Sequence, residues 1–333
     1  MGHIEAQLAK APADRPVVIC AADTHGDMHA AEIVMKSMRL VSRRAAGASS
    51  PGKPMFFAEV EALGNRAPTS GVAGPSHTDR FEKALEDFRT SGTDPLKSMY
   101  PHLDIDPDQL PDEMDRRSAS VNRQLVALKA SAAALGVSCD YIERSDYPMW
   151  KAKEARQGRQ VNESDYQQWR AGQDHEKRLL ARLGAQQANL LAAFSPDRED
   201  LQVANVDVFL GAGGSGCVLW PGIDHLAYLG EALADRCTFI AVAPIGQDVM
   251  DVIKKSSPRS GERISYCISH PEVFAFQTDF APCNAGRFKE LMQSFSLDGG
   301  GVGQSGQPVD GPGSSASSGP GGNDAGMPGS RAS

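Results

Sequence analysis

The sequence predicts an α/β fold: a largely parallel central β-sheet flanked by helices, with a loop-rich insertion and a disordered C-terminal tail. Short apolar runs rich in Val, Ile and Phe alternate with longer segments whose apolar residues recur at helical spacing. This alternation is typical of βαβ units, in which a helix crosses over to the next parallel strand. The composition agrees, because 41% of the 333 residues are hydrophobic and 23% are charged, which is ordinary for a globular protein.

The expected strands are short apolar runs that end in polar or turn-forming residues. They occupy residues 16–22, 53–60, 137–143, 203–213, 237–244 and 272–280. The expected helices carry an apolar stripe; in the first of them Ile33, Val34, Met38 and Val41 fall near one face. Helices are predicted at residues 28–46, 79–88, 119–136, about 163–194 and 223–235, with an interruption of the fourth near 171–173.

One folded domain is expected between two flanking segments. Residues 1–14 are predicted to be flexible, and residues 15–296 to form a single α/β domain with an insertion at about 62–117. Residues 297–333 are rich in Gly, Ser and Pro and contain almost no large apolar side chain. Burial cannot offset the entropy of ordering such a segment, so we expect a disordered tail.

Charge and hydropathy exclude several classes of protein. A formal net charge of −8 argues against a nucleic-acid partner. No stretch approaches the roughly 18 continuous apolar residues of a membrane span. The N-terminus lacks the basic flank and apolar core of a Sec-type signal peptide. The six cysteines form no C-x-x-C pair, which indicates a reduced, cytosol-like compartment rather than a disulfide framework.

The first group of candidate site residues follows the first predicted strand. His25 comes directly after it, and the carboxylate of Asp23 is placed to hold the imidazole of His25 in one tautomer. His29 lies four residues further on and is a secondary candidate, although it also fits an ordinary solvated helix position. The zinc signature H-E-x-x-H fails, because Gly26 stands where its glutamate belongs.

The second group lies at the end of the second predicted strand. Glu59 and the secondary candidate Glu61 share one face of that strand, because side chains alternate with a period of two. A buried glutamate is costly unless it is paired. If the first two strands are neighbours, a carboxylate at this end approaches His25; a solvated strand end is the alternative.

The third group surrounds a glycine-rich stretch. Residues 211–216, GAGGSG, satisfy the G-x-G-x-x-G pattern of dinucleotide-binding folds. The helix that should begin at the third glycine is replaced by a segment containing Pro221, and the next strand lacks the acidic residue that would hold a ribose. Asp224, a secondary candidate, and His225 then stand at a helix N-terminus, which favours an anion or a polarised oxygen.

Together these three groups resemble the superfamily of erythromycin esterases, ChaN-like proteins and TraB/Tiki-type proteases, which includes domains of bacterial toxins and type III effectors. That family has a strand, a G-E-x-H-G or G-x-x-H motif, a helix and a strand ending in glutamate. Here AADTHG (21–26), the helix at 28–46 and FFAEVE (56–61) follow that order. The later family strand of the GAGH type is similar to VFLGAG (208–213), with DHLAYLGEAL (224–233) as its helix.

The resemblance implies a hydrolase, of the esterase or metal-dependent protease class, that acts on a small molecule or a peptide. His25 would be the general base or a metal ligand, with Glu59, Asp23 and His225 completing the site. The implied cofactor is a divalent metal, held by His25, Glu59 and His225, or else haem. The protein would be cytoplasmic, or a virulence effector or toxin secreted into a host cell without a Sec signal.

The family motifs are degenerate here, and this leaves a second function open. Ala21 or Ala22 replaces the glycine of the first motif, and the motif glutamate is either lost or represented by Asp23. Gly214 stands where the family has histidine after GAG. The alternative is therefore a non-catalytic module that binds haem or a host protein. A third hypothesis, a nucleotide-binding Rossmann enzyme, depends on residues 211–216 alone.

Overall fold

The fold was analysed in a computed structural model of the chain. The structure describes residues 2–23, 26–47, 52–59, 77–101, 109, 113–143, 146–182, 196–244, 273–276 and 281–297. The chain divides into two units, Met1–Val302, which contains all of these residues, and Gly303–Ser333.

Six strands of the described chain form one sheet, and every neighbouring pair is parallel. The order across the sheet is β3-β2-β4-β1-β5-β6. The strands are β1 (Val17–Ala21), β2 (Met55–Ala58), β3 (Ser138–Tyr141), β4 (Gly216–Trp220), β5 (Thr238–Pro244) and β6 (Val273–Phe276). The predicted α/β fold with a largely parallel sheet is therefore confirmed.

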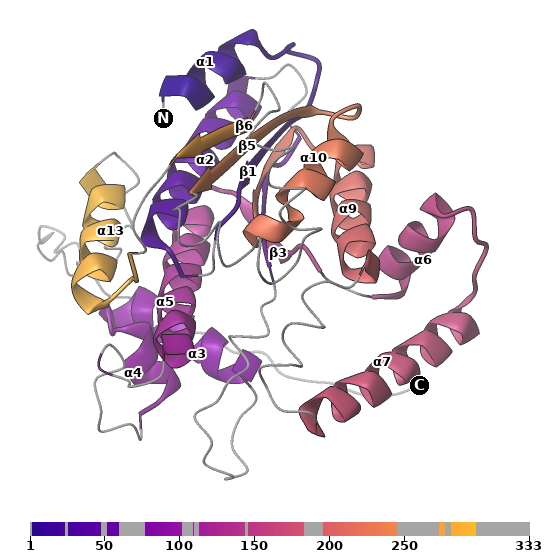
Figure 1. Cartoon of the computed structure of the whole chain (residues 1–333). Helices are drawn as coiled ribbons and strands as arrows, with labels where there is room; N and C mark the ends of the chain where they lie inside the picture. The colour runs from indigo at the N-terminus through magenta and orange to yellow at the C-terminus, as the bar shows by residue number, and fades with distance from the viewer. Residues whose placement is uncertain are drawn as a thin grey trace, which may run out of the picture. The chain divides into compact units, whose positions relative to one another are not determined.

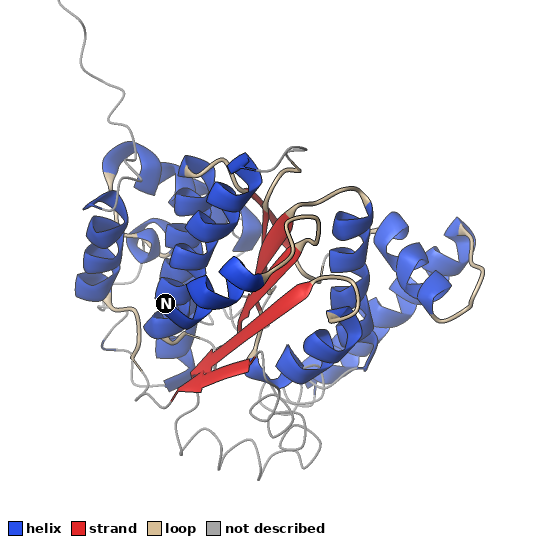
Figure 2. Ribbon diagram, turned by 90° about the horizontal axis from the view of Figure 1, so that it is seen from above, coloured by secondary structure: helices blue, strands red, loops and turns tan. Residues whose placement is uncertain are grey.

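Helices cover both faces of the sheet (Figure 2). The helices are α1 (Gly2–Lys10), α2 (Met28–Gly47), α3 (His77–Ser91), α4 (Pro95–Met99), α5 (Glu113–Ala134), α6 (Tyr147–Arg156), α7 (Glu163–Arg182), α9 (Pro196–Gly211), α10 (Leu226–Leu233) and α13 (Ala285–Leu297). A short 3-10 helix, η2 (Ile223–His225), precedes α10.

Two apolar cores lie on opposite sides of the sheet. On β1, Val17 and Ile19 belong to the core that contains α2, α5 and α13, whereas Val18 and Cys20 belong to the core that contains α9 and α10. Strands buried on both faces need apolar residues at every position. This requirement explains why the central strands are continuous apolar runs rather than alternating ones.

The chain reverses direction across the sheet between β4 and β1, which are neighbours. Figure 1 labels β1 beside β5 and β6 in this sheet. After β1 the chain runs through α2 on one face to β2, and after β4 it runs through α10 on the other face to β5. In open α/β sheets, ligands bind at the carboxyl ends of the strands where such a switch occurs. The topology therefore predicts a ligand site at the carboxyl ends of β4 and its neighbours.

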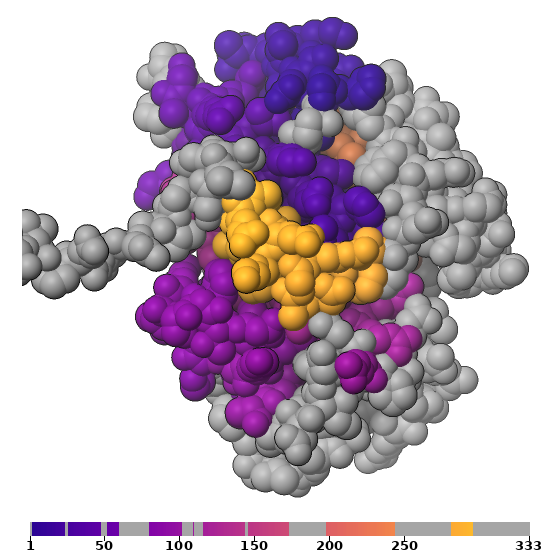
Figure 3. Space-filling view, turned by 90° about the vertical axis from the view of Figure 1, so that its left-hand side faces the viewer, coloured from indigo at the N-terminus to yellow at the C-terminus, as the bar shows by residue number. Residues whose placement is uncertain are grey.

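Helix α13 closes the core on the α2 side. Figure 3 shows it, in yellow-orange, between the indigo N-terminal helices and the magenta segment that contains α3 and α5. Phe288, Leu291 and Phe295 are buried in that core, and the Phe88 and Phe288 rings meet edge to face with centroids 5.2 Å apart. This helix had no counterpart among the elements predicted from the sequence.

The strand predicted at 203–213 is wrong, because residues 196–211 form helix α9. The GAGGSG stretch therefore follows a helix and leads into β4, at the amino edge of the sheet. Gly213 ends the helix with a φ of 86°, and a Cβ on Gly214 would lie 2.4 Å from the Phe209 ring. These glycines serve a turn and close packing, and they lack the strand-to-helix context of a dinucleotide fingerprint.

Other differences are smaller. Helix α7 runs through residues 171–173 without the predicted interruption, while the rest of that predicted helix, 183–194, lies outside the described residues. At the N-terminus, predicted to be flexible, α1 packs Ile4 into the core. Within the predicted insertion, α3, α4 and the start of α5 are helical. Residues 298–333 of the predicted tail lie outside the described residues.

None of the described helices is long and apolar enough to cross a membrane, as the sequence predicts. The cysteines within the described residues, at 20, 139, 217, 237 and 283, are all free thiols.

Candidate functional site

Three polar side chains follow three neighbouring strands at the carboxyl edge of the sheet. Glu59 comes directly after β2, Glu143 two residues after β3, and His225 at the end of η2, five residues after β4. Backbone hydrogen bonds extend the ladder past the strand ends: the Glu59 amide donates to the Trp220 carbonyl at 3.2 Å, and the Ile142 amide to the Ala58 carbonyl at 2.8 Å. The backbone at Glu59 and beside Glu143 is therefore fixed relative to the end of β4.

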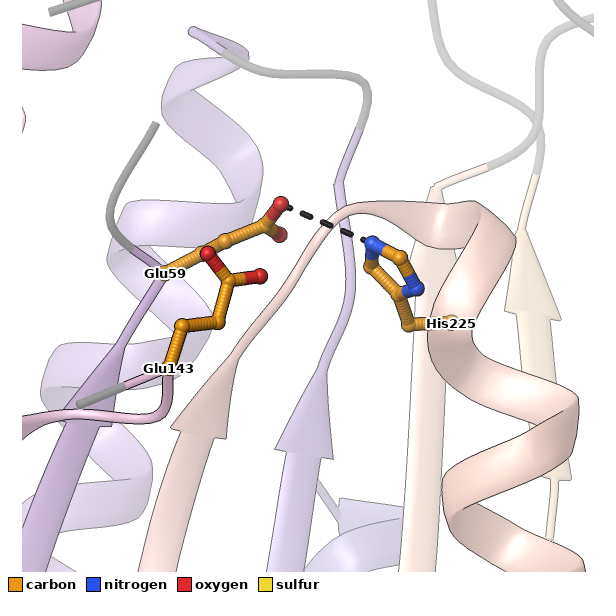
Figure 4. Close-up of side chains that lie close together, drawn as sticks. All are labelled: Glu59, Glu143 and His225. Carbon is orange, nitrogen blue, oxygen red and sulfur yellow. Dashed lines mark ion pairs between the residues drawn. The ribbon is translucent and has the colours of Figure 1, made fainter. Parts of the chain in front are cut away.

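The three side chains converge. One ligand atom from each of Glu59, Glu143 and His225 lies within 4.8 Å of the other two. The His225 Nε2 atom is 3.6 Å from Glu59 Oε1 (Figure 4). Glu59 and His225 are buried, and the Glu143 side chain is 11% exposed.

Helix α9 adds a second layer of polar groups from its first two turns. Arg198 bridges the two carboxylates, donating from Nη2 to Glu59 Oε1 and from Nε to Glu143 Oε1. Gln202 donates to the same Glu143 oxygen at 2.7 Å. Glu199 Oε1 lies 3.3 Å from His225 Nδ1, and so it fixes the side of the imidazole that faces away from Glu59.

The backbone supplies one further donor to Glu59. The amide of Gly222 donates to Glu59 Oε2, while Arg198 contacts the other oxygen. Arg198, Gln202 and the Gly222 amide thus give the two carboxylates the donors that buried carboxylates require.

The surroundings shift the pKa values of two of these groups. Burial alone would lower the pKa of His225, but the charge of Glu59 and the hydrogen bonds to Glu199 and Glu59 outweigh burial and raise it to about 9, against the opposing charge of Arg198. Burial and the charge of Glu59 raise the pKa of Glu143, although Arg198 and Gln202 act against this shift. Clustered, perturbed titratable groups of this kind are frequent at functional sites.

The predicted residues Glu59 and His225 are thus brought together, and Asp23 lies beside them in the backbone. Asp23 pairs with Gly222 in a parallel bridge: its amide donates to Pro221, and its carbonyl accepts from Ile223 at 2.7 Å. β4 separates β1 from β2, so the condition under which a carboxylate after β2 would approach His25, that the first two strands are neighbours, is not met. His25 and Glu61 lie outside the described residues.

The other secondary candidates have different surroundings. Asp224 is half-buried beside His225. His29 lies in the first turn of α2. The Asp27 carboxylate, just before the helix, accepts from the His29 amide at 2.8 Å and lies 2.9 Å from the His29 Nδ1 atom. The His29 side chain is 41% exposed, which fits a capped helix terminus on the surface.

Sequence reasoning missed Glu143, Arg198, Glu199 and Gln202. Glu143 ends the apolar run 137–143, exactly as Glu59 follows the run before it, and this parallel was the available signal. The three α9 residues gave no usable signal, because they lie between the helix predicted up to about 194 and the strand predicted from 203, where no element is expected. One sequence pattern becomes visible only in the fold: A-D-T-H (22–25) follows β1, and G-I-D-H (222–225) follows the adjacent β4.

No family model matches this sequence, and no curated protein or solved structure is significantly similar to it. A proposal for the function therefore has to be argued from the side chains at the carboxyl edge of the sheet.

Proposed function

We propose that this chain is a hydrolase of the erythromycin esterase/ChaN/Tiki-like type, with its active site at the carboxyl edge of the sheet and a divalent metal as cofactor. The observation that carries the proposal is the convergence of Glu59, Glu143 and His225 from three neighbouring strand ends. A mixed carboxylate and imidazole set placed at a topological switch point is suited to activating water.

The donor set fits a divalent transition metal. Two carboxylate oxygens and one imidazole nitrogen are ligands that Mn²⁺, Fe²⁺ and Zn²⁺ accept, and the ring is held by a second carboxylate in the manner common for metal-binding histidines. Glu59, Glu143 and His225 would hold the ion, which supplies Lewis acidity for the ionisation of water.

The chain's own residues have separate roles in this proposal. Glu199 orients the His225 ring, and the Gly222 amide and Gln202 fix the two carboxylates. Arg198, a partly exposed cation beside the cluster, would be available to the negative charge that develops during hydrolysis of an acyl or phosphoryl group. The role of His25 as general base or metal ligand remains a prediction.

The family resemblance supports the proposal at one further point. The G-x-x-H spacing that the resemblance assigns to the first histidine recurs at Gly222–His225, after the neighbouring strand. In the sequence, His25 follows the last residue of β1 by four positions and His225 follows the last residue of β4 by five. Delivery into a host cell as an effector or toxin depends on the resemblance alone.

The test is hydrolysis by the purified full-length protein with Mn²⁺ or Zn²⁺. The panel comprises aryl esters, lactones, phosphomonoesters and peptides, and the variants are His225→Gln and Glu59→Gln. We expect each variant to lose at least about a hundredfold in turnover, the usual range for metal ligands and acid–base groups. Glu290→Gln, an exposed glutamate on α13, is the matched control and should keep full activity. Unchanged turnover in both site variants would refute the assignment.

A second candidate function is a non-catalytic module that binds haem or a host protein. The observation in its favour is that Arg198 engages both carboxylates, so the cluster also makes sense as a purely structural ion network. For the haem form, titration should give a Soret band that His225→Gln abolishes. No hydrolysis with any substrate, combined with such a band, would favour this candidate.

A further inference from the structure

We propose that Arg198 is an exchangeable counter-cation: its guanidinium neutralises Glu59 and Glu143 in the metal-free protein and leaves them when a divalent metal binds. The inference depends on the metal site of the proposed function and concerns how that site is regulated. Its effect is to set the metal affinity, because each binding event must displace Arg198.

The first argument is that the guanidinium and the metal need the same atoms. Arg198 contacts Glu59 Oε1, which is also the oxygen closest to His225 Nε2, and it contacts Glu143 Oε1. These carboxylates are two of the three members of the metal-capable group. A cation that bridges them therefore excludes a second cation from the same place.

The second argument is electrostatic. Glu59, Glu143 and Glu199 bring three carboxylates into a buried cluster, and buried carboxylates need compensating positive charge. Arg198 supplies part of that charge, from the same helix as Glu199, and it is the part that Glu59 and Glu143 share. A divalent ion between Glu59 and Glu143 would supply it in place of the guanidinium, so the carboxylates remain compensated in both states.

The third argument is that the carboxylates stay in place without Arg198. The Gly222 amide holds Glu59, and Gln202 holds Glu143 at 2.7 Å. Arg198 lies in the first turn of α9, and its side chain is 19% exposed, compared with 3% for Glu59. Arg198 is therefore the most exposed side chain of the cluster, ahead of Glu143 at 11%, and it can withdraw while its partners remain ordered.

Metal affinity of the Arg198→Gln variant tests the exchange. The probes are Mn²⁺ and Zn²⁺ alone, and the measurements are the dissociation constant by calorimetry and the melting temperature. We expect Arg198→Gln to bind the metal at least about tenfold more tightly than the wild type, because no cation has to be displaced. Without metal the variant should melt at a lower temperature, and the metal should restore it. Arg156→Gln, which removes an arginine paired with Asp207, is the control and should leave the metal affinity unchanged.

A measurement on the wild-type protein covers the case in which the variant does not fold. Phenylglyoxal modifies accessible guanidinium groups, and mass spectrometry reports the modification of each arginine. Mn²⁺ should increase modification of Arg198 and leave that of Arg156 unchanged. Equal or weaker metal binding by Arg198→Gln, or no rise in Arg198 modification on metal binding, would overturn the inference. Hydrolysis that persists in either case would leave the proposed function standing.

Discussion

His225 is the residue at which burial and charge compete most directly. Its side chain is only 3% exposed, which disfavours the imidazolium, yet carboxylates approach both of its ring nitrogens. The carboxylates prevail and raise its pKa to about 9. In the metal-free protein at neutral pH both ring nitrogens therefore carry a proton. His225 would have to release one of the two to become a metal ligand.

This raised pKa predicts a pH dependence of stability. A histidine whose folded pKa exceeds its unfolded value of 6.5 stabilises the fold fully below pH 6.5. The contribution declines as the pH rises and is lost as it passes through about 9. A shift of this size corresponds to roughly 3 kcal/mol. Denaturant unfolding in chelator should show the wild type losing stability between pH 6.5 and 9.

The His225→Gln variant isolates that contribution. The difference in unfolding free energy between wild type and variant should shrink over the same pH interval, because other groups titrate alike in both proteins. A constant difference across the interval would mean that His225 does not carry the raised pKa.

Part of the candidate site, Glu59 and His225, could be identified from the sequence alone. Glu59 and His225 stand next to recognisable apolar strands, so position along the chain was sufficient to select them. Arg198 and Glu199 have no such neighbour, and their importance depends on where α9 begins relative to the sheet. Long-range placement of a charged residue is a tertiary property, and local patterns do not encode it.

Helix α9 shows why one element was misassigned. Its segment contains Val203, Val206, Val208 and Phe209, which favour strands, and it lacks a clear polar face. The polar residues that would mark such a face, including Gln202 and Asn205, are buried toward the site instead of exposed. A helix that buries polar side chains loses its amphipathic pattern, so the apolar periodicity that predicts helices does not reveal it.

The turn between β1 and α2 is a second element with a demanding geometry. Gly26, the residue after His25, has a φ of 98°, and its carbonyl accepts from Ser120 Oγ at 2.6 Å and Gln124 Nε2 at 2.8 Å. A Cβ on Gly26 would lie 3.1 Å from the Arg117 carbonyl oxygen. Helix α5 thus fixes the point at which the chain leaves the predicted His25 position.

The Gly26→Ala substitution should therefore lower the free energy of unfolding by more than the strain of a positive φ alone. We expect a decrease of about 3 kcal/mol in unfolding free energy, from positive φ together with the clash against α5. Gly92→Ala is the matched control: Gly92 has a φ of 66° but no atom within 4 Å of its added Cβ, so about 1 kcal/mol is expected. Denaturant unfolding compares the two, and equal losses would contradict a clamped turn.

At the scale of the whole molecule, strand order assembles the candidate site. The chain visits β2 and β3 on one side, returns to place β4 beside β1, and then continues to β5 and β6. Glu59, Glu143 and His225 are separated by up to 166 positions along the chain, and yet adjacent strands bring them together. The alternation of elements predicted the fold class, whereas the order β3-β2-β4-β1-β5-β6 could not be read from local patterns, because any of several orders is compatible with parallel crossovers.

The composition of the last segment, residues 303–333, predicts how little it contributes to the stability of the protein. Residues 303–333 cluster separately from Met1–Val302, and their only larger apolar side chains are Val309 and Met327. A segment with so little apolar surface cannot add measurable hydrophobic stabilisation. A chain that ends at Val302 should melt within about 2 °C of the full-length protein, since a change of 1 kcal/mol shifts the melting temperature of a domain this large by only about 2–4 °C. Calorimetry of both chains provides the comparison, and Mn²⁺ affinity measured on both serves as a check that the site is intact. A larger drop in melting temperature, or weaker metal binding by the shorter chain, would show that these residues pack on the folded domain.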